Sequence, residues 1–126
     1  MTQEDKELLL KDLSARLPYG VKVQSTFYYC DGTVWKHEDE TLTSDLLSYP
    51  IHRYKPYLFP MSSMTEEQKK ELEDTLVEME LKAISDEIKR VDVAAYEIDF
   101  YNKYHIDYRG LIEKSLALDA TGLNIY

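Results

Sequence analysis

The stretch TEEQKKELEDTLVEMELKAISDEIKR, residues 65–90, contains the clearest structural signal in the chain. Thr65 is followed three residues later by Gln68, which is the pattern of a capping box at the start of a helix. Apolar residues then recur at helical spacing. We therefore predict a helix that begins at Glu66 and continues toward Arg90.

This helix has two apolar stripes on different sides. Leu72, Leu76, Met79 and Ala83 form the first stripe, and the second consists of Val77, Leu81, Ile84 and Ile88. Two explanations are open. The helix breaks near Ser85, so that each stripe belongs to one core, or the second stripe covers another helix or another subunit. The second stripe is therefore a candidate interface, and a monomer or a weak homodimer is expected.

A further helix is predicted from residue 91 or 92 to residue 104, and it is also two-sided. Its second side is aromatic and supplies further candidate interface residues, which are Tyr96, Phe100 and Tyr104. A position between a sheet and the preceding helix would explain this side without any partner.

The N-terminal part predicts a helix followed by a β-hairpin. Thr2 can cap a helix that ends at the Pro18–Gly20 segment, and its buried stripe is predicted to be Leu9, Leu10, Leu13 and Leu17. Residues 21–29 then alternate in the manner of a strand, and Asp31-Gly32 is a strong hairpin turn signal before a returning strand at residues 33–37.

The remaining segments are less regular. Residues 46–48 and 51–54 are predicted to be short strands added to the hairpin, and the three nearby prolines favour an edge or a crossing loop. Residues 111–116 are predicted to form one or two helical turns. Strands followed by helices favour the α+β class. We expect one domain over residues 1–126, with an N-terminal helix, an antiparallel sheet of three or four strands, two main helices and a short C-terminal helix.

Charge and composition restrict the partners. The net charge is −9, and residues 61–126 contribute −7 of it, with eight basic and fifteen acidic side chains. Such a surface repels a phosphate backbone, so direct nucleic-acid binding is not expected. The chain also has eleven tyrosines, whose rigid, amphipathic rings favour a contact surface.

Cellular context follows from absences in the sequence. The single cysteine, Cys30, cannot form an internal disulfide, which predicts the reducing cytoplasm. No signal peptide and no apolar run of membrane-spanning length are visible, so no membrane association is expected. Three histidines with scattered neighbours predict no metal site, and no cofactor is expected, because nucleotide-binding loops and the common hydrolase motifs do not occur.

The densest set of functional groups is His105, Asp107, Tyr108 and Arg109. Such a set at a helix end can form an acid–base or anion site, but it can also be a helix-end turn in which these groups pair with one another. We treat these four residues, together with Tyr57, as candidate binding residues.

Three segments together resemble small hypothetical proteins of gut Bacteroidetes and of their phages or mobile elements. They are LLLKDLSARLPYGVKV at residues 8–23, KPYLFPMSSMTEE at residues 55–67 and DYRGLIEK at residues 107–114. The resemblance implies a bacterial or phage-derived origin and no particular activity. Ser115 stands where the resemblance predicts glycine, which leaves the turn there open.

The sequence favours a non-catalytic protein–protein interaction module over an enzyme. A specific version is an acidic inhibitor of a host nucleic-acid enzyme, which would need carboxylates clustered on one exposed face. The alternative is a small enzyme or ligand-binding domain that uses residues 105–109, which would need those side chains to converge in a pocket.

Overall fold

The first helix, α1 (Gln3–Arg16), begins and ends as its sequence predicts. The computed structural model describes all residues from 1 to 126. The Thr2 hydroxyl accepts a hydrogen bond of 3.0 Å from the backbone N–H of Asp5, and a 3₁₀ turn, η1 (Leu17–Tyr19), follows the helix. Gly20 closes this turn in the left-handed region (φ 69°), where glycine is favoured.

The predicted hairpin is present. Strand β1 (Lys22–Tyr28) pairs antiparallel with β2 (Val34–Thr41). In the turn, the Asp31 carboxylate accepts hydrogen bonds from the N–H and the hydroxyl of Thr33, at 3.0 and 2.7 Å. Strand β2 is at the edge of the sheet and nearly all its side chains are exposed, several of them charged, which disfavours pairing with another chain.

The strands predicted at residues 46–48 and 51–54 are wrong. These segments form two 3₁₀ turns, η2 (Ser44–Ser48) and η3 (Ile51–Arg53), and the strand of this region is β3 (Tyr54–Pro60). Its prolines are tolerated because Pro56 is the last residue of the ladder with β1 and Pro60 the last of the ladder with β4. The two prolines lack a backbone N–H, but because they stand at ladder ends they do not interrupt the hydrogen bonds inside either ladder.

The fold class is α+β, as predicted, but the sheet is mixed rather than antiparallel. Two short strands, β4 (Ile106–Asp107) and β5 (Leu118–Asp119), pair parallel with β3; the strand order is β2-β1-β3-β4, and β5 pairs with β3 outside this path. The C-terminal helix expected at residues 111–116 is instead a series of turns. The Asp107 carboxylate accepts the N–H groups of Leu111 and Ile112, at 2.9 Å each, and Ser115 turns the chain with a φ of 60°.

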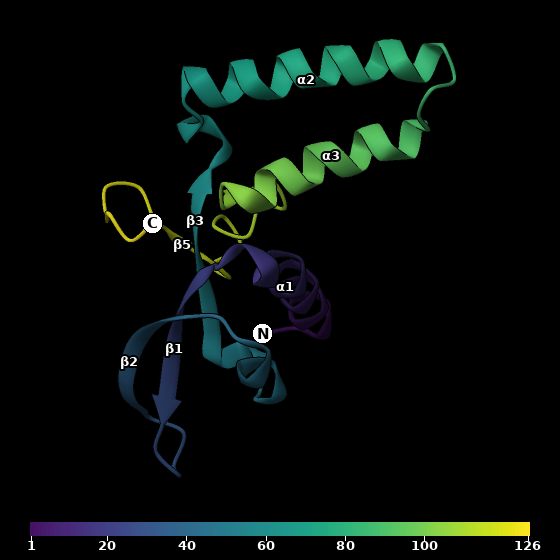
Figure 1. Cartoon of the computed structure of the whole chain (residues 1–126). Coiled ribbons are helices and arrows are strands. Elements are labelled where there is room, and N and C mark those ends of the chain that lie inside the picture. Colours follow the sequence, from purple (N-terminus) through teal and green to yellow (C-terminus); the bar gives the residue numbers. More distant parts are fainter.

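Helices α2 (Glu66–Ile84) and α3 (Arg90–Lys103) form a hairpin at one end of the molecule, beyond α1 and the sheet (Figure 1). The capping box is present, because the Thr65 hydroxyl accepts the N–H of Gln68 and the Gln68 amide oxygen accepts the N–H of Thr65. The helix ends at Ile84, six residues earlier than its predicted limit at Arg90, and Asp86 turns the chain with a φ of 61°.

Two apolar clusters hold these elements together. The larger cluster joins α1 to the sheet and the C-terminal turns, and includes Leu9, Leu13, Val21, Val23, Leu42, Tyr54, Leu58, Leu111, Leu116 and Ala117. The smaller cluster joins the α2–α3 hairpin to β4 through Leu72, Phe100 and Ile106. The hairpin is therefore attached to the sheet near one end only.

Candidate functional site: the groove of the helical hairpin

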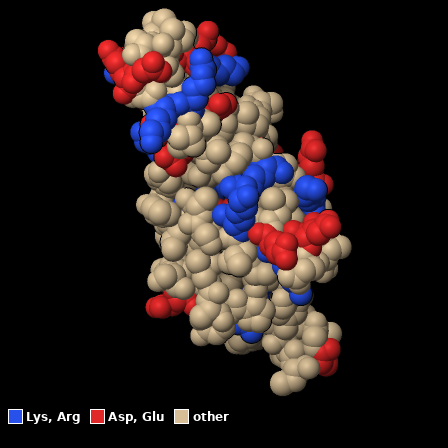
Figure 2. Space-filling model, turned by 90° about the vertical axis from the view of Figure 1, so that its right-hand side faces the viewer, with Lys and Arg blue, Asp and Glu red and all other residues tan.

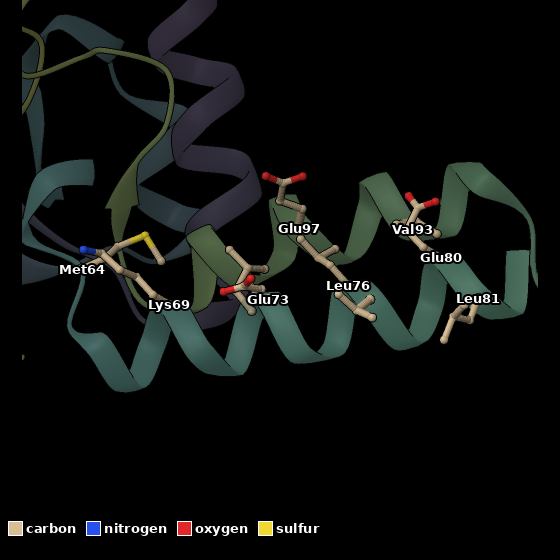
Figure 3. A pocket seen from close by; sticks show the side chains of 10 residues that line it. Met64, Lys69, Glu73, Leu76, Glu80, Leu81, Val93 and Glu97 are labelled. Carbon is tan, nitrogen blue, oxygen red and sulfur yellow. The ribbon is translucent and has the colours of Figure 1, made fainter.

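A groove with a volume of about 600 Å³ runs between α2 and α3. Figure 3 shows its lining side chains, which come from both helices and from the segment before α2. Its apolar lining consists of Met64, Leu72, Leu76, Val77, Leu81 and Val93, and its charged lining of Lys69, Glu73, Glu80 and Glu97. The size is that of a ligand-binding or peptide-binding cleft.

One wall of the groove is exposed to an unusual degree. Val77 and Leu81 are 56% and 63% exposed, and Ile84 and Val91 at the tip of the hairpin are 68% and 66% exposed. These side chains do not belong to either apolar cluster. Contiguous exposed apolar side chains of this kind mark interaction surfaces more often than isolated ones do.

The structure separates the two sets of candidate interface residues. Val77, Leu81 and Ile84 are exposed, so the break of the helix after Ile84 does not bring their stripe into a core, and Ile88 is half-buried in the connection. Phe100 is only 3% exposed and packs with Leu72 and Ile106, while half-buried Tyr96 and Tyr104 lie around it. Phe100 is therefore internal, whereas Tyr96 and Tyr104 are only partly covered.

The charged lining is mainly acidic. Three carboxylates and one ammonium group give the lining a net charge of −2. Glu80 pairs with Arg90 at 2.9 Å, and Lys69 pairs with Glu66 at 3.4 Å. Glu73 has no cationic partner, and Glu97 only accepts a hydrogen bond of 2.8 Å from the Tyr101 hydroxyl. The groove thus combines an apolar wall with carboxylates that are free to meet cations.

Residues 105–109 are adjacent but engage different partners. The His105 ring stacks on Tyr126, with 3.7 Å between ring centroids and 13° between planes, and its Nδ1 has no hydrogen-bond partner. Burial, together with the charge of Arg16, lowers the pKa of His105 to about 4. The ring is therefore neutral at physiological pH and is held as a packed aromatic group.

Asp107 and Arg109 hold the backbone and α1 in place. Both Asp107 oxygens accept backbone N–H groups of the following turn. The Arg109 guanidinium lies 3.2 Å from Asp12 of α1 and donates to the Tyr108 hydroxyl at 2.8 Å. These are the contacts of a helix-end turn.

Asp12 also pairs with Arg16, at 2.9 Å, and both side chains are fully buried. Burial raises the pKa of Asp12, and the guanidinium groups of Arg16 and Arg109 offset part of that rise. Arg16 donates a second hydrogen bond, of 2.6 Å, to the Ile106 carbonyl of β4. The cluster therefore connects α1 to β4, the short strand that follows α3.

Tyr57 lies apart from this cluster. Its hydroxyl donates a hydrogen bond of 2.6 Å to Asp39 of β2, and burial together with that carboxylate raises the pKa of Tyr57 to about 12. A hollow of about 450 Å³ beside the turn is lined by Asp107 and Tyr108, but His105, Arg109 and Tyr57 do not line it. The five candidate binding residues do not share one cavity.

Sequence reasoning missed several contacts around this turn. The Asp12–Arg16 pair carried a signal, because opposite charges four residues apart interleave with the buried Leu9 and Leu13. No sequence pattern indicated the role of Tyr126. Its hydroxyl donates to the Tyr57 carbonyl at 2.7 Å and accepts from the Lys22 N–H at 2.8 Å, a position set only by the folded sheet.

The surface charge and the arrangement of possible metal ligands restrict which functions the structure supports. On the face in Figure 2, basic and acidic side chains lie next to one another, so this face shows no field of carboxylates of the kind that imitates nucleic acid. No group of three or more His, Cys, Asp or Glu side chains is placed to hold a metal ion, and none of the helices is long and apolar enough to cross a bilayer.

No protein-family model, curated protein or solved structure matches the chain.

Proposed function

We propose that this protein is a non-catalytic binding module whose α2–α3 groove takes an amphipathic helix of another protein. The observation that carries the proposal is the exposed apolar wall formed by Val77 and Leu81, which has no partner within the chain. A third helix laid along the groove would cover this wall in the way that helical bundles cover theirs.

The charge of the groove lining indicates what kind of partner helix it binds. The groove lining has a net charge of −2, and neither Glu73 nor Glu97 is in an ion pair. A partner helix that carries Lys or Arg on both sides of its apolar stripe would pair with these carboxylates. A second copy of this chain would instead bring two acidic grooves together, at a net charge of −9 per molecule.

The test uses two designed 18-residue helical peptides with the same Leu stripe, one with Lys and one with Glu beside the stripe. Fluorescence anisotropy at low salt measures their binding to the full chain. We expect the Lys peptide to bind at least about tenfold more tightly than the Glu peptide.

Two variants of equal charge separate groove binding from general attraction. Leu81→Asp places a carboxylate in the apolar wall, and we expect it to weaken binding of the Lys peptide by at least about tenfold. Val34→Asp on β2 adds the same charge at a comparably exposed position away from the groove. It should bind the Lys peptide at least as well as the wild type does. Equal binding by the two variants, or no binding of the Lys peptide to the wild type, would contradict the proposal.

A further inference from the structure

A second hollow, with a volume of about 320 Å³, lies between the face of the sheet and the 3₁₀ turns η2 and η3. It is at the end of the molecule opposite the α2–α3 hairpin (Figure 1). Glu38, Ser25 and Tyr54 lie side by side on β2, β1 and β3, because the strand registers pair Ser25 with both of the others. Three strands thus bring three polar side chains into one row beneath the hollow.

Two hydroxyl groups in this row are free to bind a ligand. Ser25 is 2% exposed, lines the hollow, and its Oγ has no hydrogen-bond partner in the protein. The Tyr54 hydroxyl also makes no hydrogen bond, and burial raises its pKa, so it stays a neutral hydroxyl whose oxygen can accept a hydrogen bond from a cation. A buried hydroxyl without a partner is uncommon in folded proteins, and a water or a ligand group in the hollow would complete it.

The hollow also contains opposite charges that do not pair with each other. Glu40 and Arg53 both line it, and neither is in an ion pair. Glu38 pairs only with Lys36, at 3.6 Å, and both of these side chains are about half exposed (53% and 46%), so the pair is weak and can be exchanged. Arg53 lies 5.4 Å from the ring centroid of Tyr49, which holds the guanidinium at the rim.

We infer that this hollow binds a basic α-amino acid. The ligand carboxylate pairs with Arg53, and its cationic side chain lies between Glu38 and Glu40, where the hydroxyl oxygens of Ser25 and Tyr54 accept hydrogen bonds from its remaining N–H groups. The three charged residues give the hollow a net charge of −1, which a ligand of net charge +1 balances. The inference does not rest on the α2–α3 groove, because none of its residues lines that groove.

The experiment titrates the full chain with L-arginine in a calorimeter at low salt. L-Citrulline, which has no side-chain cation, and L-arginine amide, which has no carboxylate, serve as the comparison ligands. We expect L-arginine to bind with a Kd below about 1 mM and each comparison ligand to bind at least about tenfold more weakly. No binding of L-arginine at millimolar concentration, or equal binding of all three ligands, would overturn the inference.

Variants assign the two ends of the ligand. Glu40→Gln should weaken L-arginine binding about tenfold and remove the preference over L-citrulline, whereas Arg53→Gln should remove the preference over L-arginine amide. Glu78→Gln on α2 makes the same charge change outside the hollow and should bind like the wild type. If Glu78→Gln and Glu40→Gln have equal effects, the attraction comes from the overall charge and the inference fails.

Discussion

Three tyrosine hydroxyls donate hydrogen bonds to carboxylates within the molecule, from Tyr57 to Asp39, from Tyr101 to Glu97 and from Tyr104 to Glu71. A fourth, that of Tyr126, ties the C-terminal residue to β1 and β3. The excess of tyrosine therefore has a partly internal explanation, since each ring fills space while its hydroxyl satisfies a polar group. Composition alone does not distinguish this use from a contact surface.

Ser115 adopts a φ of 60°, which costs a residue with a side chain about 1 kcal/mol or more. We expect Ser115→Gly to raise the free energy of unfolding by about 0.5–1 kcal/mol, measured by urea denaturation. Ser14→Gly, in the last turn of α1, is the matched control and should lower that free energy by about 0.5 kcal/mol. A destabilising effect of both changes would show that the Ser115 turn carries no strain.

His105 should make stability depend on pH. Its pKa is about 4 in the folded chain and 6.5 ordinarily, so the unfolded chain binds the additional proton between these values. The free energy of unfolding therefore falls as the pH drops from 6.5 toward 4. We expect His105 to account for about 1 kcal/mol of this loss, after allowance for the partial exposure of the ring.

Urea denaturation of His105→Asn at several pH values tests this dependence. Asparagine does not titrate here and tolerates the left-handed φ of 58° at this position. The variant should lose less stability than the wild type between pH 7 and pH 4.5, whatever its stability at pH 7. His52→Asn, at an exposed position, should keep the wild-type slope. Parallel slopes for all three proteins would contradict the prediction.

At the scale of the element, the two sides of the α2–α3 hairpin have different energetic roles. Phe100 is buried against Leu72 and Ile106, so Phe100→Ala should lower the free energy of unfolding by about 3–4 kcal/mol. Leu81 is mostly exposed, so Leu81→Ala should change that free energy by less than about 0.5 kcal/mol. Chemical denaturation of both variants measures the contrast, and a large effect of Leu81→Ala would place its side chain in a core.

Elements with strong local signals were predictable from the sequence. The Thr2 cap, the Asp31-Gly32 turn and the capping box at Thr65 each fix a boundary through contacts within a few residues. The break after Ile84 was one of two open explanations, and the exposure of Val77 and Leu81 shows that a break need not bury a stripe.

Elements that depend on distant contacts were not predictable. Strands β4 and β5 have two residues each and exist only because β3 lies beside them. Strand β3 itself was obscured by Pro56 and Pro60, whose positions at ladder ends are set by the partners. For the candidate site, the sequence identified the stripe with Val77 and Leu81. It did not reveal that residues 105–109 divide their contacts among Tyr126, Asp12 and the backbone.

At the scale of the whole molecule, charge opposes self-association. With a net charge of −9 and an acidic groove, we expect a monomer of 14.8 kDa over a wide concentration range, measured by light scattering at physiological salt. An increase in mass with concentration that Leu81→Asp abolishes would identify the groove as a homodimer interface. That outcome would contradict the proposal of a basic partner helix.

The helical hairpin leaves and rejoins the sheet at two neighbouring points. The chain leaves the sheet at Pro60 and returns at Ile106, and these two points are adjacent, because Phe59 pairs with Ile106 and its N–H donates to the His105 carbonyl at 2.8 Å. A segment whose ends meet can change in length or sequence at little cost to the elements that carry it. Residues 61–105 are thus inserted between two adjacent points of the sheet, and Phe100 on Ile106 and His105 on Tyr126 are among their contacts with the rest of the chain. Grafting them onto another sheet with the same spacing would transfer the binding preference, while the remaining scaffold could accept a different hairpin in their place.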